Sequence, residues 1–478
     1  MATKENFSVV IKKFHPGVTG SAILVQINYP NGTKELFLVD CGLFQEPRYS
    51  ELNDKLPCDP KDLSFVLVTH NHCDHIGRLP LLTARGFNKP IFTSESTAKL
   101  MSLSLRDNLR VLTDKAKKEK KPFLYGGDSV DRALSLLKTV PYYQTYKFSE
   151  NIKFTFLMNG HLTGASMILV QISSAQAGGK GKINLLFSGD YSSRNVFFDV
   201  PPIPAWIREL PICIISEATY GSIESKDIKK VYANNVTNAL KEGKIILSPV
   251  FSLGRAQKLL YFYRTLQEAG VISTDIPIYL DGHLTQNYTN LYINDGFENK
   301  EELRGKNFLP LNWSYESYVD RVKRPVLVQD GKQKIILSSS GMGSYGPSAF
   351  YIPALLTRKN VLIHFTGYAA EGTLARKLFE AKSGETVDIN GKGTYVGAEI
   401  KFTSEFSDHA KADELIEFYK SFNKVQCILI NHGEPEDQKN LRNRAISEGF
   451  NSNSVVLLSE NDIRIGEFSK VIKILPAN

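Results

Sequence analysis

Four potential metal ligands follow the end of a predicted strand, and this cluster limits most strongly what the chain can fold into. They lie in THNHCDHIGRLP (69–80) and are His70, His72, Asp74 and His75. Side chains two residues apart in an extended segment point the same way, and the turn that follows brings the last two ligands beside the first two. Neutral imidazole and carboxylate suit zinc or a similar divalent ion. We therefore predict a metal centre at a strand end rather than a loop of unrelated surface histidines.

Buried strands recur along the chain. Short apolar runs that end at polar or glycine-rich turns lie at residues 35–42, 65–70, 90–95, 183–190 and 212–221. From residue 244 each predicted strand is followed by a helix, as in KIILSPVF before GRAQKLLYFYRTLQEAG. Such repeated units predict an α/β fold with a parallel sheet that is covered on both faces.

The change of pattern predicts a domain that another domain interrupts. We assign residues 1–220 to the first part of one domain, 221–398 to an inserted parallel-sheet domain, and 399–478 to the return. The return is indicated by CILINHG (427–433), which has the pattern of a last strand, and by the charged helical stretch after it. The loop SSAQAGGKGK (173–182) predicts a hairpin turn.

Charge and cysteine usage narrow the class of protein. Lysine and arginine number 58 against 50 acidic residues, and the net charge of +8 suits a polyanionic substrate without requiring one. The five cysteines stand singly, so we expect neither a disulfide framework nor a thiolate zinc site, and a reducing cytoplasm fits best. The sequence shows no signal peptide and no apolar run of the roughly 18 residues that a membrane span needs.

Further ligand candidates stand at the ends of other predicted strands. They are Asp40, His161, Asp190 and His432. Parallel-type sheets display active residues at the carboxyl ends of their strands. A strand-end aspartate can instead cap a turn, and this alternative applies to Asp40 and Asp190 when each is considered alone. His15, His283 and His364 match no ligand pattern, and we interpret them as structural or surface residues.

The ordered set of these residues resembles the β-CASP family of the metallo-β-lactamase superfamily. Asp40, His70-x-His72-x-Asp74-His75, His161 and Asp190 look like the superfamily motifs, whereas Glu217, His409 and His432 resemble the three further β-CASP motifs. PVFSLGRAQ (249–257), SSSGM (338–342), GYAAEGTLAR (367–376) and VDING (387–391) are also similar to family stretches. The family includes bacterial and archaeal RNA nucleases and the endonuclease subunit of eukaryotic polyadenylation machinery.

The resemblance implies a fold and a metal site. The fold would be a four-layer αββα hydrolase domain interrupted by the β-CASP domain, with the active site in the cleft between them. One zinc would be held by His70, His72 and His161, and a second by Asp74, His75 and His432. Asp190 would bridge the two, and Asp40 would fix the tautomer of a ligand histidine. Another divalent metal is an alternative to zinc.

The resemblance also implies a reaction. Hydroxide activated by the two metals would attack an RNA phosphodiester and leave a 5′-phosphate on the downstream fragment. His409 would act as the general acid, oriented by Glu217, and Asp74 is counted with these two among the catalytic residues. The partner would be single-stranded RNA, and a homodimer is left open.

Candidate RNA contacts are less distinctive. Backbone N–H groups in the SSSGM turn could face a phosphate, and two arginines could clamp the backbone, although surface ion pairs are an alternative for both. These candidates are Ser339, Ser340, Gly341, Arg255 and Arg376. The chain departs from many bacterial relatives at 281–283 (Asp-Gly-His) and at 344–346 (Ser-Tyr-Gly). The basic run KAKKEKK (115–121) is interpreted as a solvated helix face or loop, with a direct substrate role as the alternative.

Three other functions are alternatives to a ribonuclease. A DNA repair nuclease of the same superfamily is disfavoured because such relatives usually carry valine where this chain has His432. A small-molecule hydrolase such as a lactamase or thioesterase needs no inserted domain with Glu217 and His409. A non-catalytic scaffold would typically have lost metal ligands, and every ligand is present here.

Overall fold

The chain folds into two compact units. The computed structural model describes residues 7–14, 17–174, 181–367, 369, 372–458, 461–466 and 469–476. The first unit consists of Met1–Ser225 with Asp408–Asn478, and the second of Lys226–Ser407. His15 and residues 175–180 of the expected hairpin turn lie outside the described residues.

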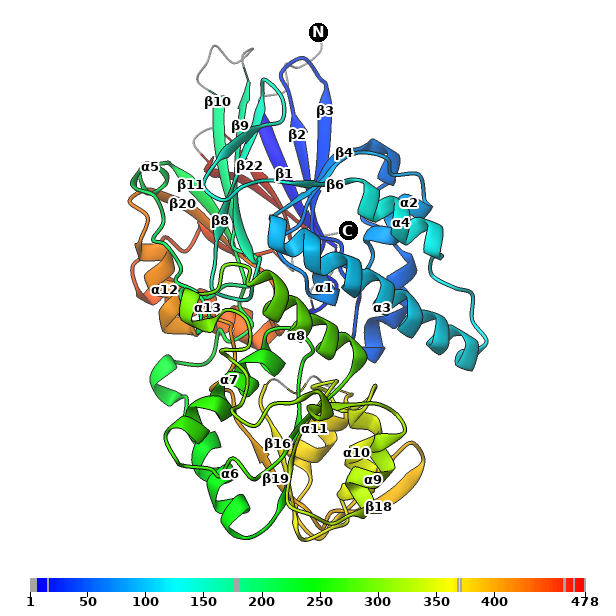
Figure 1. Cartoon of the computed structure of the whole chain (residues 1–478). Coiled ribbons are helices and arrows are strands. Elements are labelled where there is room, and N and C mark those ends of the chain that lie inside the picture. The colour runs from blue at the N-terminus through cyan, green and yellow to red at the C-terminus, as the bar shows by residue number, and fades with distance from the viewer. Residues whose placement is uncertain are drawn as a thin grey trace. The chain divides into compact units, whose positions relative to one another are not determined.

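Two sheets form the centre of the first unit (Figure 1). One has the order β23-β22-β1-β2-β3-β4-β5-β6: Val471–Pro476, Asn461–Ile465, Ser8–Lys13, Ile23–Asn28, Lys34–Val39, Leu63–Leu67, Ile91–Thr93 and Leu137–Thr139. The other has the order β21-β20-β11-β10-β9-β8-β7: Val455–Leu457, Val425–Ile430, Ile212–Ser216, Gly181–Phe187, Ser166–Ser174, Ile152–Met158 and Thr145–Lys147.

Alternation along the strands builds four layers. Phe37 and Phe65 point into the apolar core shared by the two sheets, whereas the next residues, Leu38 and Val66, point to the opposite face. Helices α2 (Leu79–Ala84), α3 (Glu95–Glu119) and α4 (Gly127–Ser135) cover that face. Helices α5 (Ala205–Arg208), α12 (Ala412–Lys420) and α13 (Pro435–Ser447) cover the second sheet. The predicted αββα arrangement is confirmed.

The second unit contains a wholly parallel sheet. Its order is β14-β13-β15-β12-β16-β19: Tyr318–Val319, Ile278–Asp281, Ile335–Ser338, Ile245–Pro249, Val361–Phe365 and Glu399–Phe402. Its helices are α6 (Tyr232–Lys241), α7 (Arg255–Glu268), α8 (His283–Asp295), α9 (Lys323–Gln329), α10 (Ser348–Leu355) and α11 (Leu374–Glu380). A two-stranded hairpin joins β17 (Thr386–Ile389) to β18 (Lys392–Tyr395). The predicted parallel sheet is confirmed.

One cysteine pair departs from the sequence-based expectation. Cys213 in β11 and Cys427 in β20 are partners in the register of two parallel strands, with Cα atoms 4.6 Å apart, and form a disulfide. No disulfide framework was expected from the sequence and this single pair was not foreseen, while Cys41, Cys58 and Cys73 are free. Because 214 residues separate the two in sequence, only the folded sheet brings them together.

No helix in the described part of the chain has both the length and the apolar character that crossing a membrane requires.

Candidate metal centre

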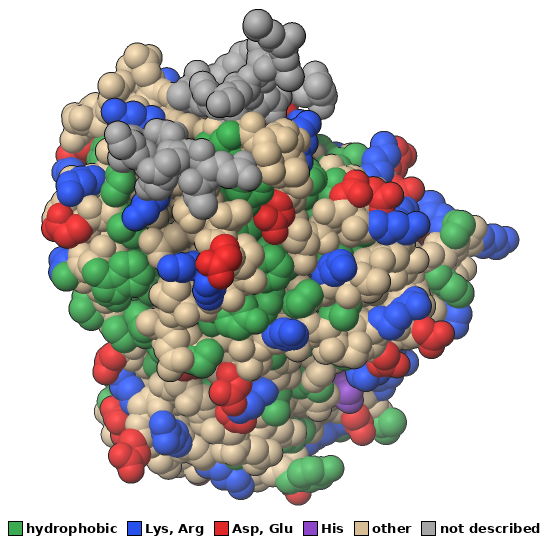
Figure 2. All heavy atoms as spheres, turned by 90° about the horizontal axis from the view of Figure 1, so that it is seen from above, with side chains coloured by type: hydrophobic (Ala, Val, Ile, Leu, Met, Phe, Trp, Pro, Cys, Tyr) green, Lys and Arg blue, Asp and Glu red, His purple; other side chains and the backbone are tan. Residues whose placement is uncertain are grey.

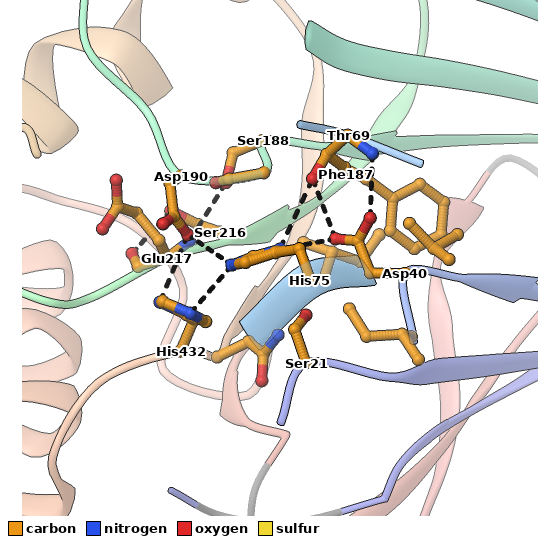
Figure 3. Close-up of a pocket in the computed structure, with 15 residues that line it drawn as sticks. Ser21, Asp40, Thr69, His75, Phe187, Ser188, Asp190, Ser216, Glu217 and His432 are labelled. Atoms are coloured by element: carbon orange, nitrogen blue, oxygen red, sulfur yellow. Dashed lines mark hydrogen bonds and ion pairs between the residues drawn. The ribbon is translucent and has the colours of Figure 1, made fainter. Parts of the chain in front are cut away.

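The candidate ligands of the first unit converge because each follows the end of a strand. Asp40 follows β3, His70 follows β4, His161 follows β8, Asp190 follows β10, Glu217 follows β11 and His432 follows β20. Short helix α1 (Cys73–Ile76) supplies Asp74 and His75. Figure 3 shows His75 between Asp40 and Asp190 in a pocket, with His432 and Glu217 beside them.

Three histidines and one oxygen of Asp190 form the first candidate ligand set. Nδ1 of His72 lies 3.1 Å from Nε2 of His70 and 3.1 Å from Nε2 of His161. Oδ2 of Asp190 lies 3.5 Å from each of the same two Nε2 atoms. All four ligand atoms lie within 4.8 Å of one another, which is the spacing that a single metal ion can bridge.

The second ligand set uses the other oxygen of Asp190. Oδ1 lies 3.3 Å from Nε2 of His75 and 3.3 Å from Nδ1 of His432. The two histidines approach each other to 3.2 Å, and Oδ2 of Asp74 lies 3.9 Å from His75 and 3.8 Å from His432. Asp190 therefore presents one oxygen to each set.

The donor chemistry of these residues fits divalent cations. Oδ1 of Asp190 is buried and accepts no hydrogen bond, although two imidazole nitrogens face it. Burial lowers the pKa of His70 well below its usual value and that of His72 to about 4, which favours the neutral imidazoles that bind metals. Burial also opposes protonation of His75, but the Asp190 and Asp40 carboxylates raise its pKa well above the usual value. Where these carboxylates face ring nitrogens, a bound metal ion can take the place of a proton, and its binding would release that proton.

Hydrogen bonds on the far side of the rings orient the ligands. Oδ2 of Asp40 lies 2.8 Å from Nδ1 of His75, so this nitrogen carries the proton and Nε2 is left for a metal. Asp40, whose φ is +60°, also accepts bonds of 2.8 Å from the backbone N–H and the hydroxyl of Thr69. Because that hydroxyl is used as a donor, it accepts from Nδ1 of His70 at 3.1 Å. Nδ1 of His161 lies 3.3 Å from the backbone carbonyl oxygen of Asp408, which can only accept a hydrogen bond. This nitrogen therefore carries the proton, and Nε2 is left for a metal.

Thr69 is a site residue that the sequence analysis missed. It carries no metal-ligand chemistry, and its one signal was its position directly before His70. The hydroxyl of Thr219 lies 3.3 Å from Nδ1 of His432. Threonine is not a metal ligand of the kind that the sequence motifs show, so this residue was missed as well.

A close backbone approach fixes the helix that carries Asp74 and His75. A side chain at Gly42 would collide with the backbone of Asp74. The loop after β3 can therefore dock directly on α1, where the N–H of Cys41 donates to the carbonyl of His75 at 2.7 Å and that of Leu43 to Cys73 at 3.0 Å.

His409 and Glu217 form a proton-holding pair at the edge of the ligands. Nδ1 of His409 lies 2.8 Å from Oε2 of Glu217, and Nε2 lies 4.0 Å from Oδ2 of Asp190. The other oxygen of Glu217 accepts from the N–H of Tyr191. Burial opposes protonation of His409, but the Glu217 carboxylate raises its pKa above the usual value. The His409 side chain is 19% exposed, against 3% for Asp190, so His409 is the more accessible to a substrate.

The candidate RNA contacts lie in the second unit. Ser339, Ser340 and Gly341 follow β15, in the turn that leads to α10, and Arg255 opens α7 as a buried residue. A side chain at Gly341 would lie 3.2 Å from Phe251, so this turn packs against the loop before α7.

Arg376 forms a surface ion pair, which is the alternative to a contact with the RNA backbone. On α11 its Nε pairs with Oε1 of Glu380 at 2.6 Å, as a surface ion pair.

Three family models match segments of the chain. The Metallo-beta-lactamase superfamily matches residues 15–127, the Beta-Casp domain residues 256–378, and the Zn-dependent metallo-hydrolase RNA specificity domain residues 395–456. An RNase J-like protein of Methanocaldococcus jannaschii is 31% identical over 438 residues, which cover 89% of this chain and 93% of the relative. This chain belongs to the β-CASP family of the metallo-β-lactamase superfamily.

Other β-CASP relatives match over similar lengths. Ribonuclease TTHA0252 of Thermus thermophilus is 29% identical, over 88% of this chain and 91% of its own length. Transcription termination factor FttA of Methanosarcina mazei is 26% identical, over 90% of this chain and 70% of its own length.

Proposed function

We propose that this β-CASP protein is a ribonuclease that hydrolyses RNA phosphodiester bonds with two zinc ions and leaves 5′-phosphate ends. The observation that carries the proposal is the division of the Asp190 carboxylate, with Oδ2 at 3.5 Å from His70 and His161 and Oδ1 at 3.3 Å from His75 and His432. A carboxylate shared in this way is suited to bridging two ions.

Zinc ions bound by the two sets would supply Lewis acidity that activates water and neutralises phosphate charge. The chain's own residues would do the rest. Asp40 and Thr69 hold the ligand histidines in the tautomer that leaves the metal-facing nitrogen free. His409 would donate a proton from Nε2 to the departing 3′-oxygen, while Glu217 holds Nδ1 and keeps the ring protonated.

RNA is the substrate class that the relatives favour. Two of the similar proteins are named as an RNase J-like protein and a ribonuclease, and the match at residues 395–456 is described as an RNA specificity domain. That segment includes both His409 and His432. Ser339, Ser340, Gly341, Arg255 and Arg376 are proposed to contact the RNA backbone, with Arg376 exchanging Glu380 for a phosphate.

The test is cleavage of end-labelled single-stranded RNA and DNA of one sequence, with and without a chelator, and with an Asp190→Ala variant alongside. We expect RNA fragments with 5′-phosphate ends, lost in chelator and in the variant. Faster cleavage of DNA would replace the proposal with a DNA nuclease. Cleavage that survives both the chelator and the substitution would exclude the two-metal site as its source.

A further inference from the structure

Helix α3 is anchored to the loops that carry the metal ligands. At its start, the hydroxyls of Ser94 and Thr97 donate to the carbonyl of Gly164, at 2.6 and 2.8 Å, in the loop that follows His161. Further along, Asn71, which stands between two ligand histidines, donates to the hydroxyl of Ser104 at 2.6 Å. The first half of α3 is therefore fixed to the metal centre.

The other end of α3 carries a basic tip. Lys117 lies 13 residues beyond Ser104, and a helix rises 1.5 Å per residue, so the tip begins about 20 Å further along the helix axis. We define the tip by its exposed side chains: Lys117, Lys118, Lys120, Lys121 and Phe123. In Figure 2, on the side where α3 ends in Figure 1, lysine and arginine side chains lie at the surface among acidic and apolar ones.

The charge of the tip is only weakly compensated within its own segment. Residues 115–121 hold five lysines and one acidic residue, Glu119. Glu119 lies 2.9 Å from Lys121 and 4.0 Å from Lys115. Exposed ion pairs of this kind contribute little energy, so a polyanion can displace them readily.

An aromatic ring stands among these lysines. Phe123 is 57% exposed, although the phenylalanines of the same unit's core, such as Phe37 and Phe65, are fully buried. An exposed aromatic ring beside lysines is the combination with which proteins bind single-stranded nucleic acid, because the ring stacks on a base while the cations neutralise phosphates. A cluster of lysines is also found on surfaces that bind nothing but water. The exposed ring of Phe123 beside the lysines favours a surface that binds RNA.

We infer that the α3 tip binds single-stranded RNA outside the metal centre, with the four lysines on phosphates and Phe123 stacked on a base. The inference rests on the proposed function, since the strand held there would be the substrate. Because α3 is fixed to the ligand loops at its start, the tip would hold the RNA at a set distance from the bond that is cut.

The experiment compares two fourfold variants of the full chain with equal loss of charge. The tip variant carries Lys117→Gln, Lys118→Gln, Lys120→Gln and Lys121→Gln. The control carries Lys34→Gln, Lys147→Gln, Lys153→Gln and Lys182→Gln. The control lysines are exposed and lie at the strand ends opposite to those that Asp40, His161 and Asp190 follow.

The measurement is the affinity for a single-stranded RNA of about 20 nucleotides as a function of salt. Each phosphate contact adds about 0.7 to the slope of log affinity against log salt for single strands, so the tip variant should lose up to about 3 of that slope. Between roughly 50 and 200 mM salt, this makes the affinity of the variant about 50-fold less sensitive to salt than that of the wild type. The control should keep the wild-type slope.

A second pair of variants tests the aromatic ring at constant charge. Phe123→Ala should weaken RNA binding about 10-fold, with no change in salt slope, and Phe123→Trp should restore it, since a larger ring still stacks. Circular dichroism of all variants should match the wild type, because every substitution is at an exposed position.

Three outcomes separate the possibilities. If the wild type neither binds nor cleaves RNA, the proposed function fails and the tip has no RNA to hold. If the wild type cleaves RNA but the tip and control variants show equal slopes, the tip inference alone is wrong. If the lysines matter but both Phe123 variants bind as the wild type does, the stacking part is wrong.

Discussion

Replacing His409 with alanine is expected to slow RNA cleavage about 10²- to 10⁴-fold while both metals stay bound. Nε2 of His409 lies at the edge of the ligand cluster, 4.0 Å from Asp190, and Nδ1 is held by Glu217 at 2.8 Å, so neither nitrogen belongs to a ligand set. The typical cost of losing a general acid has this size and equals about 3 to 5 kcal/mol of transition-state free energy.

The assay uses two substrates and a metal analysis. One RNA is ordinary, and the other carries sulfur in place of the leaving 3′-oxygen at the scissile bond. A thiolate departs without protonation, so the variant should cleave the sulfur substrate at nearly the wild-type rate. His161→Ala is the matched control, because the ring of this candidate ligand lies next to that of His409, with centroids 4.7 Å apart and planes tilted by 55°. That variant should lose metal and cleave neither substrate.

Two results would refute the role of His409. Metal content that falls in step with activity would make the residue a ligand. Unchanged cleavage of ordinary RNA would make it a bystander.

Three further predictions concern metal content and stability. Metal analysis should find about two zinc ions per chain in the wild type and a loss of occupancy in Asp190→Ala; full retention would remove Asp190 from the bridge. His364 is buried against the ring of Tyr232, and burial lowers its pKa to about 3, so the unfolded chain takes up a proton below about pH 6.5 that the folded chain refuses. Between about pH 6 and 4, the free energy of unfolding of the wild type should therefore fall by about 1.4 kcal/mol per pH unit more than that of His364→Phe. Urea denaturation of both proteins at several pH values measures this difference. Stability curves that run parallel over this pH range would contradict the prediction. Asp281→Ala should destabilise the second unit by about 3 to 5 kcal/mol, because the buried Asp281 accepts two bonds from Arg324, at 2.7 and 2.8 Å, and a third from the hydroxyl of Tyr351 at 2.9 Å; a loss below about 1 kcal/mol would show that these contacts are not structural.

The sequence could predict the strands and their ends because apolar runs that stop at polar or glycine-rich turns are local signals, whereas the four layers followed from the resemblance to the metallo-β-lactamase superfamily. Phe37 and Leu38 are both apolar, so the chain itself shows a strand buried on both faces but not which face packs on the other sheet and which on the helices. The motif that contains His70 and His75 is likewise compact. The strand–helix repeats after residue 244 predicted the parallel sheet for the same reason.

Contacts between distant segments could not be predicted in this way. Cys213 and Cys427 meet only because β11 and β20 are neighbours in one sheet. Thr69 gains its role from the positive φ of Asp40, which turns the carboxylate toward both Thr69 and His75. The buried pair of Asp281 with Arg324 joins residues 43 positions apart and follows no sequence pattern.

The measurement that tests the central claim most directly is a zinc titration of the metal-free protein, followed by the rate of cleavage of single-stranded RNA. The shared Asp190 carboxylate predicts no cleavage without metal and a rate that reaches its plateau at two zinc equivalents per chain. A plateau at one equivalent, or cleavage by the metal-free protein, would contradict the two-metal account.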